Sequence, residues 1–131
     1  MSERVGIKIE KIREYLKLLG EMKAECEERF PKDPVYRGAL LHYLSDSCIS
    51  LAELIIRERE LRTPQSYSEA IDILGEAGII PPDFAYEFAK IAAFRNFLAH
   101  DYEKMDYLRI CGEALRKLDD ISRYIGFMEK S

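Results

Sequence analysis

The sequence has 131 residues, which fits one domain, and we expect residues 1–131 to fold as a single unit. It carries 20 Lys and Arg residues against 24 Asp and Glu residues, a net charge of −4. This balance excludes a broad basic surface that holds nucleic acid by charge alone, but not a small local site. With no apolar run of about 18 residues and no signal-peptide core, the sequence predicts a protein of the reducing cytoplasm that does not enter a membrane.

The three cysteines, Cys26, Cys48 and Cys111, lie far apart, and each falls in an apolar helical pattern. Their odd number and wide spacing predict core thiols without a disulfide framework. The only two histidines are His42 and His100, and there is no Cys-x-x-Cys motif, so the chain offers few zinc ligands. No glycine-rich phosphate loop follows a strand either, and we therefore expect no metal and no cofactor.

Helical periodicity starts at the beginning of the chain. Apolar residues at steps of three and four predict helices over residues 3–29 and 34–61, with prolines between them. Ser66 and Glu69 have the spacing of a capping box, which opens a short helix that ends at Gly78.

Two further helices complete the chain, over residues 82–99 and 106–128, and no strand of useful length is predicted. Four long amphipathic helices with short links predict an all-α fold, an antiparallel four-helix bundle with the short helix in its second connection. The fourth helix is the most apolar, which favours a central position or one shared with a second subunit.

The fourth helix places one charge among its apolar residues. Arg95 follows Phe84, Phe88 and Ile91 on the same stripe, at steps of three and four residues. A guanidinium there is costly unless it meets an anion or a carboxylate. The neighbouring stripe consists of small residues and Asn96, which is the only asparagine in the chain.

His100 lies four residues after Asn96, so both share a face if the helix reaches that far. Arg95 and His100 can converge on one ligand if the helix ends near Ala99. A purely structural interpretation is also possible. In it, Arg95 and His100 only interact with the negative end of the helix dipole, which stabilises the helix by ~0.3–1 kcal/mol, and Tyr102 is an ordinary half-buried aromatic residue. The local pattern leaves this interpretation open beside a polar site.

The second helix also carries polar residues. His42 and Asp46 are four residues apart, which favours a surface or helix-stabilising pair over a second catalytic unit. A longer polar stripe on this helix consists of Tyr43, Asp46, Ser50, Glu53 and Arg57. We interpret it as a face exposed to solvent, and the alternative is that it lines a cleft.

The stretch Arg95-Asn96-Phe97-Leu98-Ala99-His100-Asp101-Tyr102 resembles the signature of HEPN-domain proteins. More narrowly, it resembles HepT-type toxins, in which Arg, four residues, His, one residue and Tyr form the core motif. The resemblance covers nearly the whole chain, since residues 64–67, 73–81 and 93–94 also follow the family in order. The second helix departs from it, because Ser50 and Glu53 stand where many relatives carry Asp and Asn.

The resemblance implies a metal-independent endoribonuclease that acts as a homodimer, with the two motifs forming a composite cleft for RNA. It also implies a cognate MntA-like nucleotidyltransferase as antitoxin. In relatives this antitoxin transfers AMP to the motif tyrosine, here Tyr102, and silences the nuclease.

The residues suit this chemistry. RNA cleavage without a metal uses the 2′-OH as nucleophile, and His100 can transfer the proton near neutral pH, worth ~10²–10⁴-fold. Arg95 offers a planar, always-charged fork to the phosphorane transition state, and Asn96 can orient His100 or the phosphate. AMP on Tyr102 adds bulk and negative charge beside Arg95.

Two alternatives stay open. The chain can be a non-catalytic helical partner that docks on a minimal nucleotidyltransferase and binds nucleotide or substrate, or a structural helical dimer. The full set of Arg95, Asn96, His100 and Tyr102 favours the nuclease, because a docking bundle has no need of all four.

Overall fold

The structure is a computed structural model that describes residues 2–96 and 107–130. The chain begins with α1 (Glu3–Met22), a 3-10 turn η1 (Lys23–Glu25) and the short α2 (Cys26–Arg29), which together fill the first predicted helix. Ser2 caps α1, because its hydroxyl accepts a hydrogen bond from the Val5 N–H at 3.1 Å.

The second predicted helix is divided by a π-helical turn. It consists of α3 (Pro34–Leu41), the π turn η2 (His42–Asp46) and α4 (Ser47–Glu58). Asp33 caps α3 by accepting hydrogen bonds from Val35 and Tyr36 at 3.0 and 3.2 Å. A π turn inserts one residue into the helical repeat, so the side chains after it face a new direction.

The short helix α5 (Tyr67–Glu76) begins after Ser66, whose hydroxyl accepts from the Glu69 N–H at 3.1 Å as the capping box predicts. The fourth predicted helix is two helices, α6 (Pro82–Phe88) and α7 (Lys90–Asn96), with a break at Ala89. Its predicted end at residues 97–99 lies outside the described residues. The last helix, α8 (Tyr107–Lys130), has nearly its predicted bounds.

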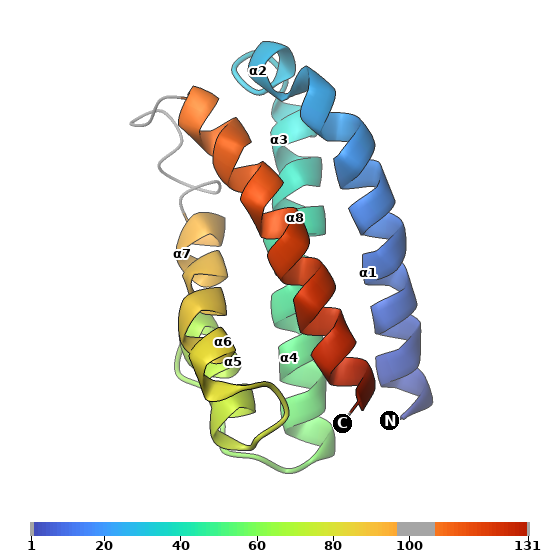
Figure 1. The fold of residues 1–131 in the computed structure, drawn as a ribbon, viewed down its shortest axis with the longest axis vertical. Coiled ribbons are helices and arrows are strands. Elements are labelled where there is room, and N and C mark those ends of the chain that lie inside the picture. Colours follow the sequence, from blue (N-terminus) through green and yellow to red (C-terminus); the bar gives the residue numbers. More distant parts are fainter. Residues whose placement is uncertain (1, 97–106, 131) are drawn as a thin grey trace.

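Figure 1 shows α1, the α3–α4 run, the α6–α7 run and α8 side by side with alternating directions, and both chain termini at the same end. The short α5 packs against α6 in the second connection. The all-α prediction of an antiparallel four-helix bundle with an extra short helix is therefore confirmed.

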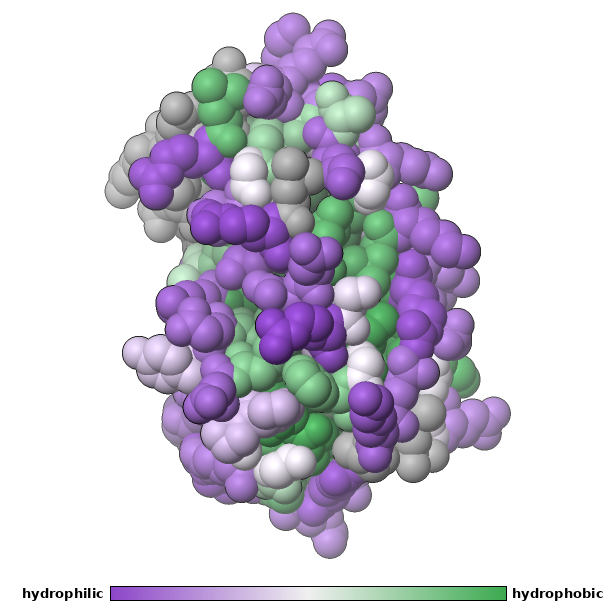
Figure 2. Space-filling view, viewed as in Figure 1, coloured by the Kyte–Doolittle hydropathy of each residue, from purple (hydrophilic) through white to green (hydrophobic). Residues whose placement is uncertain are grey.

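Aromatic residues from α6 and α8 pack against one another in the core. Phe84 and Phe88 stack at 5.1 Å, Phe88 stacks on Tyr124 at 4.4 Å, and Phe84 meets Phe127 edge-on. The buried Tyr124 hydroxyl donates to the Cys48 carbonyl on α4 at 2.8 Å, which joins three of the four long helical runs. Hydrophilic side chains cover most of the face in Figure 2, with hydrophobic ones visible between the helices.

Cys26 and Cys111 form a disulfide, so the prediction of three core thiols is wrong for these two residues. They are 85 residues apart in the sequence, but α2 packs against the beginning of α8 and brings their Cα atoms to 5.7 Å. Cys48 is a free, buried thiol as predicted, and burial raises its pKa to about 12.

Among the described residues, the run Pro34–Glu58 is the one segment long and apolar enough to cross a membrane by length and composition. From the sequence alone we expect no such segment. More than half of its most apolar window, 56%, is buried inside the bundle, and a core helix has the same composition. The absence of a membrane span stays a prediction.

Candidate active site

Arg95 lies in the last turn of α7 and forms an ion pair with Asp46 of the π turn η2. Its Nε lies 3.1 Å from Asp46 Oδ1, although the two residues are 49 positions apart. The side chains are 22% and 37% exposed, so water screens this pair less than it screens an ordinary surface pair. Asp46 is therefore the carboxylate that offsets the cost of placing the Arg95 guanidinium on the apolar stripe of the fourth predicted helix.

Asp46 is the last residue of the π turn. Within and after it, the hydroxyls of Ser45 and Ser47 donate to the carbonyls of Leu41 and Tyr43, each at 3.1 Å. These hydrogen bonds give partners to carbonyl groups in the segment where the α-helical repeat is interrupted.

Two further contacts orient the Arg95 guanidinium. Its Cζ lies 5.1 Å from the ring centroid of Tyr67, the first residue of α5, in a cation–π contact. Its Nη1 donates to Asn96 Oδ1 at 3.4 Å. Carboxylate, ring and amide together leave the guanidinium pre-oriented, with Nη hydrogens to offer an anion.

A pocket of about 440 Å³ opens beside Asn96, where α5 meets α6 and α7. Tyr67 and the 73% exposed Tyr86 contribute aromatic surface, and Asp72 and Lys90 contribute one charge of each sign. The small residues Ala89, Ala92 and Ala93 form the remaining wall together with Ser66 and Ser68. The small stripe seen in the sequence thus lines an open hollow next to the Arg95–Asn96 pair.

The structure brings together two of the predicted site residues, Arg95 and Asn96. The other two, His100 and Tyr102, lie outside the described residues. Within the described part of the chain no group of three or more His, Cys, Asp or Glu side chains could hold a metal ion. The expectation that the protein uses no metal and no cofactor stays a prediction.

The second predicted helix contributes Asp46 to the candidate site. Asp46 pairs with Arg95, so its interpretation as half of a surface pair with His42 is wrong. His42 instead contacts Tyr15 of α1. One signal was available, since Asp46 is the only aspartate between residues 34 and 61.

The two positions considered on the second helix have other surroundings. The Ser50 hydroxyl accepts a hydrogen bond from Lys8 Nζ at 2.9 Å. Glu53 lines a different hollow, together with Arg57 and Leu61. The contact of the second helix with Arg95 therefore comes from the π turn, one helical turn before Ser50.

The fold and the site define an all-α protein, an antiparallel helical bundle with a partly buried arginine–carboxylate pair at the end of its third long run. Three comparisons agree with this class. Residues 8–128 match the family described as ribonuclease HepT-like, and the chain belongs to this family of ribonucleases. The resemblance seen in the sequence is thereby confirmed.

One relative is the mRNA nuclease HepT of Shewanella oneidensis strain MR-1, which is 22% identical over 128 residues, 95% of this chain and 96% of that protein. The tri-AMPylated HEPN toxin of Shewanella oneidensis, solved in complex with MNT antitoxin, superposes with a TM-score of 0.80 at 22% identity and full coverage of both chains. A toxin–antitoxin solved with AMP-PNP has a TM-score of 0.81 at 21% identity, covering 99% of this chain and 100% of that one.

Proposed function

We propose that the protein is a metal-independent endoribonuclease, the toxin of a pair whose antitoxin is an MntA-like nucleotidyltransferase. The observation that carries the proposal is the Arg95 guanidinium at the end of α7, held by Asp46 and flanked by Asn96. An arginine oriented by an acidic partner and an aromatic ring suits the binding of a phosphodiester. The relative named an mRNA nuclease supports RNA as the substrate.

The reaction begins at the RNA 2′-OH. His100 takes its proton while the 2′ oxygen attacks the phosphorus, so that a P–O2′ bond forms and the P–O5′ bond breaks. The 5′ oxygen takes a proton from water as it leaves, His100 returns its proton to solvent, and the products are a 2′,3′-cyclic phosphate and a 5′-hydroxyl. Arg95 stabilises the charge that develops on the phosphoryl oxygens, and Asn96 orients the phosphate or His100.

A homodimer is part of this proposal. The outer face of α6 and α7 next to Asn96 presents the exposed Tyr86 and the small exposed Ala93. Small residues let a second helix approach closely, and two copies meeting there would combine two arginines in one cleft despite the net charge of −4 on each chain. We place the protein in the cytoplasm, where its RNA substrate is found.

The nuclease assignment predicts cleavage of single-stranded RNA in the presence of EDTA. Because Arg95 and His100 have separate roles in the transition state, Arg95→Ala and His100→Ala should each lower the cleavage rate by at least about 100-fold. Gel analysis of an end-labelled RNA measures the rate, and mass spectrometry of the product checks for the cyclic phosphate. Wild-type rates in both variants would refute the assignment and favour the non-catalytic partner of a nucleotidyltransferase.

Control by the antitoxin is tested separately. We expect the cognate nucleotidyltransferase to transfer AMP from ATP to the Tyr102 hydroxyl, releasing pyrophosphate, and the modified protein to lose activity. The added phosphodiester carries a negative charge, and we expect it to compete with the RNA phosphate for Arg95. Intact-mass measurement should show added AMP on the wild type and none on Tyr102→Phe. A mass increase of AMP units that persists in Tyr102→Phe would overturn the role of Tyr102.

A further inference from the structure

A second pocket lies on the other side of Asp46, between α1 and the π turn. Its volume is about 230 Å³. Its walls come from Lys8, Lys11 and Tyr15 on α1, and from His42, Asp46 and Ser50 on the opposite run. Asp46 therefore belongs both to the wall of this pocket and to the ion pair with Arg95, which places the pocket next to the candidate active site.

The α1 side of this pocket is a basic stripe. Arg4, Lys8 and Lys11 follow one another at steps of four and three residues, and Tyr15 continues the stripe four residues later, so all four share one face of α1. This concentration of positive charge is local, because the chain as a whole has a net charge of −4.

Both lysines can give hydrogen bonds to a phosphate. Lys8 is half-buried and its Nζ donates to Ser50 Oγ at 2.9 Å, which positions the ammonium and leaves two of its three donors free. Lys11 Nζ lies 3.5 Å from Glu14, and both side chains are at least 60% exposed, so this contact is weak and easily exchanged for a phosphate. The negative charge of Asp46 is already opposed by Arg95.

Two of the lining residues, Tyr15 and His42, add aromatic surface to the pocket. Tyr15 stacks on Tyr43 with centroids 4.6 Å apart, and the exposed His42 ring meets Tyr15 edge-on at 5.3 Å with its Nε2 3.4 Å from the Tyr15 hydroxyl. Proteins that bind single-stranded nucleic acid combine basic side chains along the backbone with aromatic rings that stack on the bases. Lysines beside an aromatic cluster, next to an arginine suited to a phosphodiester, form such a combination.

We propose that this pocket binds the RNA nucleotide next to the cleaved phosphodiester. Lys8 and Lys11 hold its phosphate groups, and the Tyr15–His42 surface stacks with its base. The inference rests on the proposed nuclease function and deepens it, since it places the strand across α1, the π turn and the end of α7. It makes Lys8, Lys11 and Tyr15 substrate-binding residues.

The test uses the full-length protein and a fluorescent single-stranded RNA with 2′-O-methyl groups, which cannot be cleaved by attack of its own 2′ oxygen. In anisotropy titrations, the double variant Lys8→Gln/Lys11→Gln should raise the dissociation constant about tenfold at ~0.1 M salt. Loss of two phosphate contacts should also lower the slope of log affinity against log salt by about 1.4. Tyr15→Leu should weaken binding about tenfold through lost stacking.

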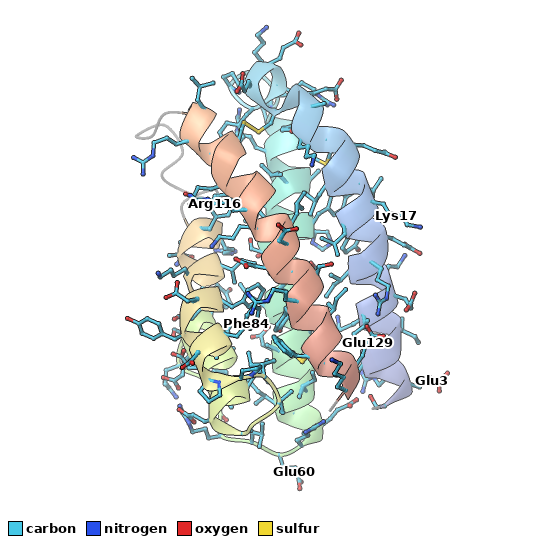
Figure 3. All side chains as sticks on the ribbon, in the orientation of Figure 1. Glu3, Lys17, Glu60, Phe84, Arg116 and Glu129 are labelled. Atoms are coloured by element: carbon cyan, nitrogen blue, oxygen red, sulfur yellow. A yellow bond between two sulfur atoms is a disulfide. The ribbon has the colours of Figure 1, made fainter. Side chains whose placement is uncertain are left out.

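The control is Lys17→Gln, which removes one positive charge from the opposite side of α1, as each of the two pocket substitutions does from the pocket side. Lys17 is exposed and lies on the outer side of the helix in Figure 3. It should leave both the affinity and the salt slope at their wild-type values. On cleavable RNA, the double variant should raise KM while kcat at saturating RNA stays within about twofold of the wild type, because the pocket binds substrate but does not touch the reacting atoms.

The outcomes separate this inference from the function on which it rests. If the wild type binds and cleaves RNA but the double variant matches Lys17→Gln in affinity and slope, the pocket inference is wrong and the nuclease stands. If the double variant keeps its RNA affinity but loses binding to the nucleotidyltransferase, the pocket is a protein-binding surface and the inference is likewise overturned. If the wild type neither binds nor cleaves RNA, the proposed function fails as well.

Discussion

Arg95 has its charge satisfied from three directions. The Asp46 carboxylate, the Tyr67 ring and the Asn96 amide come from three separate elements, η2, α5 and α7. Holding a planar cation in this way removes rotamer freedom before a ligand arrives, which lowers the entropic cost of binding an anion. The site is therefore assembled around the guanidinium, with Asp46 as a positioning residue.

Asp46→Asn tests this positioning role. The amide can still accept a hydrogen bond from Arg95 Nε but lacks the charge, so the guanidinium is held less firmly. We expect kcat for RNA cleavage to fall about tenfold, the effect of losing about 1.4 kcal/mol from a charge-assisted hydrogen bond. Steady-state cleavage assays separate kcat from KM, and circular dichroism checks that the variant is folded.

Asp119→Asn makes the same chemical change on the exposed surface of α8 and should leave kcat unchanged. A positioning role for Asp46 would be contradicted if Asp46→Asn matched this control in kcat. It would also be contradicted if activity fell only in proportion to a loss of folded protein.

At the scale of elements, the close packing of α5 on α6 depends on a glycine. A Cβ atom built on Gly75 would lie 2.6 Å from the Cβ of Ala85, a contact that neither residue can relieve by changing a rotamer. Gly75 therefore lets α5 approach α6 closely enough to form the hollow beside Asn96. Gly78, just after α5, has a φ of +76°, a conformation that glycine adopts at little cost.

Gly75→Ala should destabilise the protein by about 1–3 kcal/mol, because the overpacking outweighs the ~1 kcal/mol that Ala normally contributes in a helix. Urea unfolding followed by circular dichroism measures the free energy of unfolding. Gly126→Ala in α8 is the control, since its added Cβ meets nothing within 4 Å and the variant should be as stable as the wild type or more so. If both variants had the same free energy of unfolding, α5 and α6 would have to lie further apart in solution than they do in this structure.

The capping-box residue Glu69 also makes hydrogen bonds and ion pairs with the loop that precedes α5. Glu69 accepts a hydrogen bond from the Gln65 N–H at 3.1 Å and pairs with Arg62, and Arg62 also pairs with Glu76 at the other end of α5. These carboxylates raise the pKa of Arg62, and Arg62 lowers the pKa of Glu76. The ion pairs of Arg62 thus hold the connection between α4 and α5 against both ends of α5. Tyr67, the residue that contacts Arg95, is the first residue of this helix.

For the whole molecule, the Cys26–Cys111 disulfide joins the first helical run to the beginning of α8. Helix α8 is the first described element after the segment that carries His100 and Tyr102, and the disulfide ties the beginning of α8 to α2. Disulfides are rare in the cytosol, except in hyperthermophiles. The sequence has a thermophile-like composition, with one Asn, one Gln and 34% charged residues.

Cys26→Ala/Cys111→Ala should lower the free energy of unfolding by about 2–4 kcal/mol, because the disulfide closes a long loop in the unfolded chain. Thermal unfolding with and without reductant measures the effect. Reductant should lower the midpoint of the wild type and leave that of the double variant unchanged.

Thiol titration provides the check. The oxidised protein should show one thiol per chain after unfolding and three after reduction, since only Cys48 is free. In the folded state Cys48 should not react at neutral pH, because its raised pKa keeps the thiol protonated and its burial excludes the reagent. Three reactive thiols in the unfolded protein without reductant would contradict the disulfide.

The sequence by itself determined the helical segments, the bundle, the family and the two motif residues that the structure describes, Arg95 and Asn96. These follow from local periodicity, from capping signals such as Ser66 with Glu69, and from a short motif whose residues are neighbours in the chain. It also indicated that Arg95 needs an anion or a carboxylate as its partner, because a charge on an apolar stripe is costly without one.

Only the tertiary structure decided which residue that partner is and how the cysteines pair. Asp46 is 49 residues from Arg95, and Cys26 is 85 residues from Cys111. Helix periodicity fixes which face a side chain occupies but not which helix lies opposite, at what height, or where a π turn shifts the repeat. The pocket between α1 and η2 depends on the same long-range packing, so it too became visible only in the folded chain.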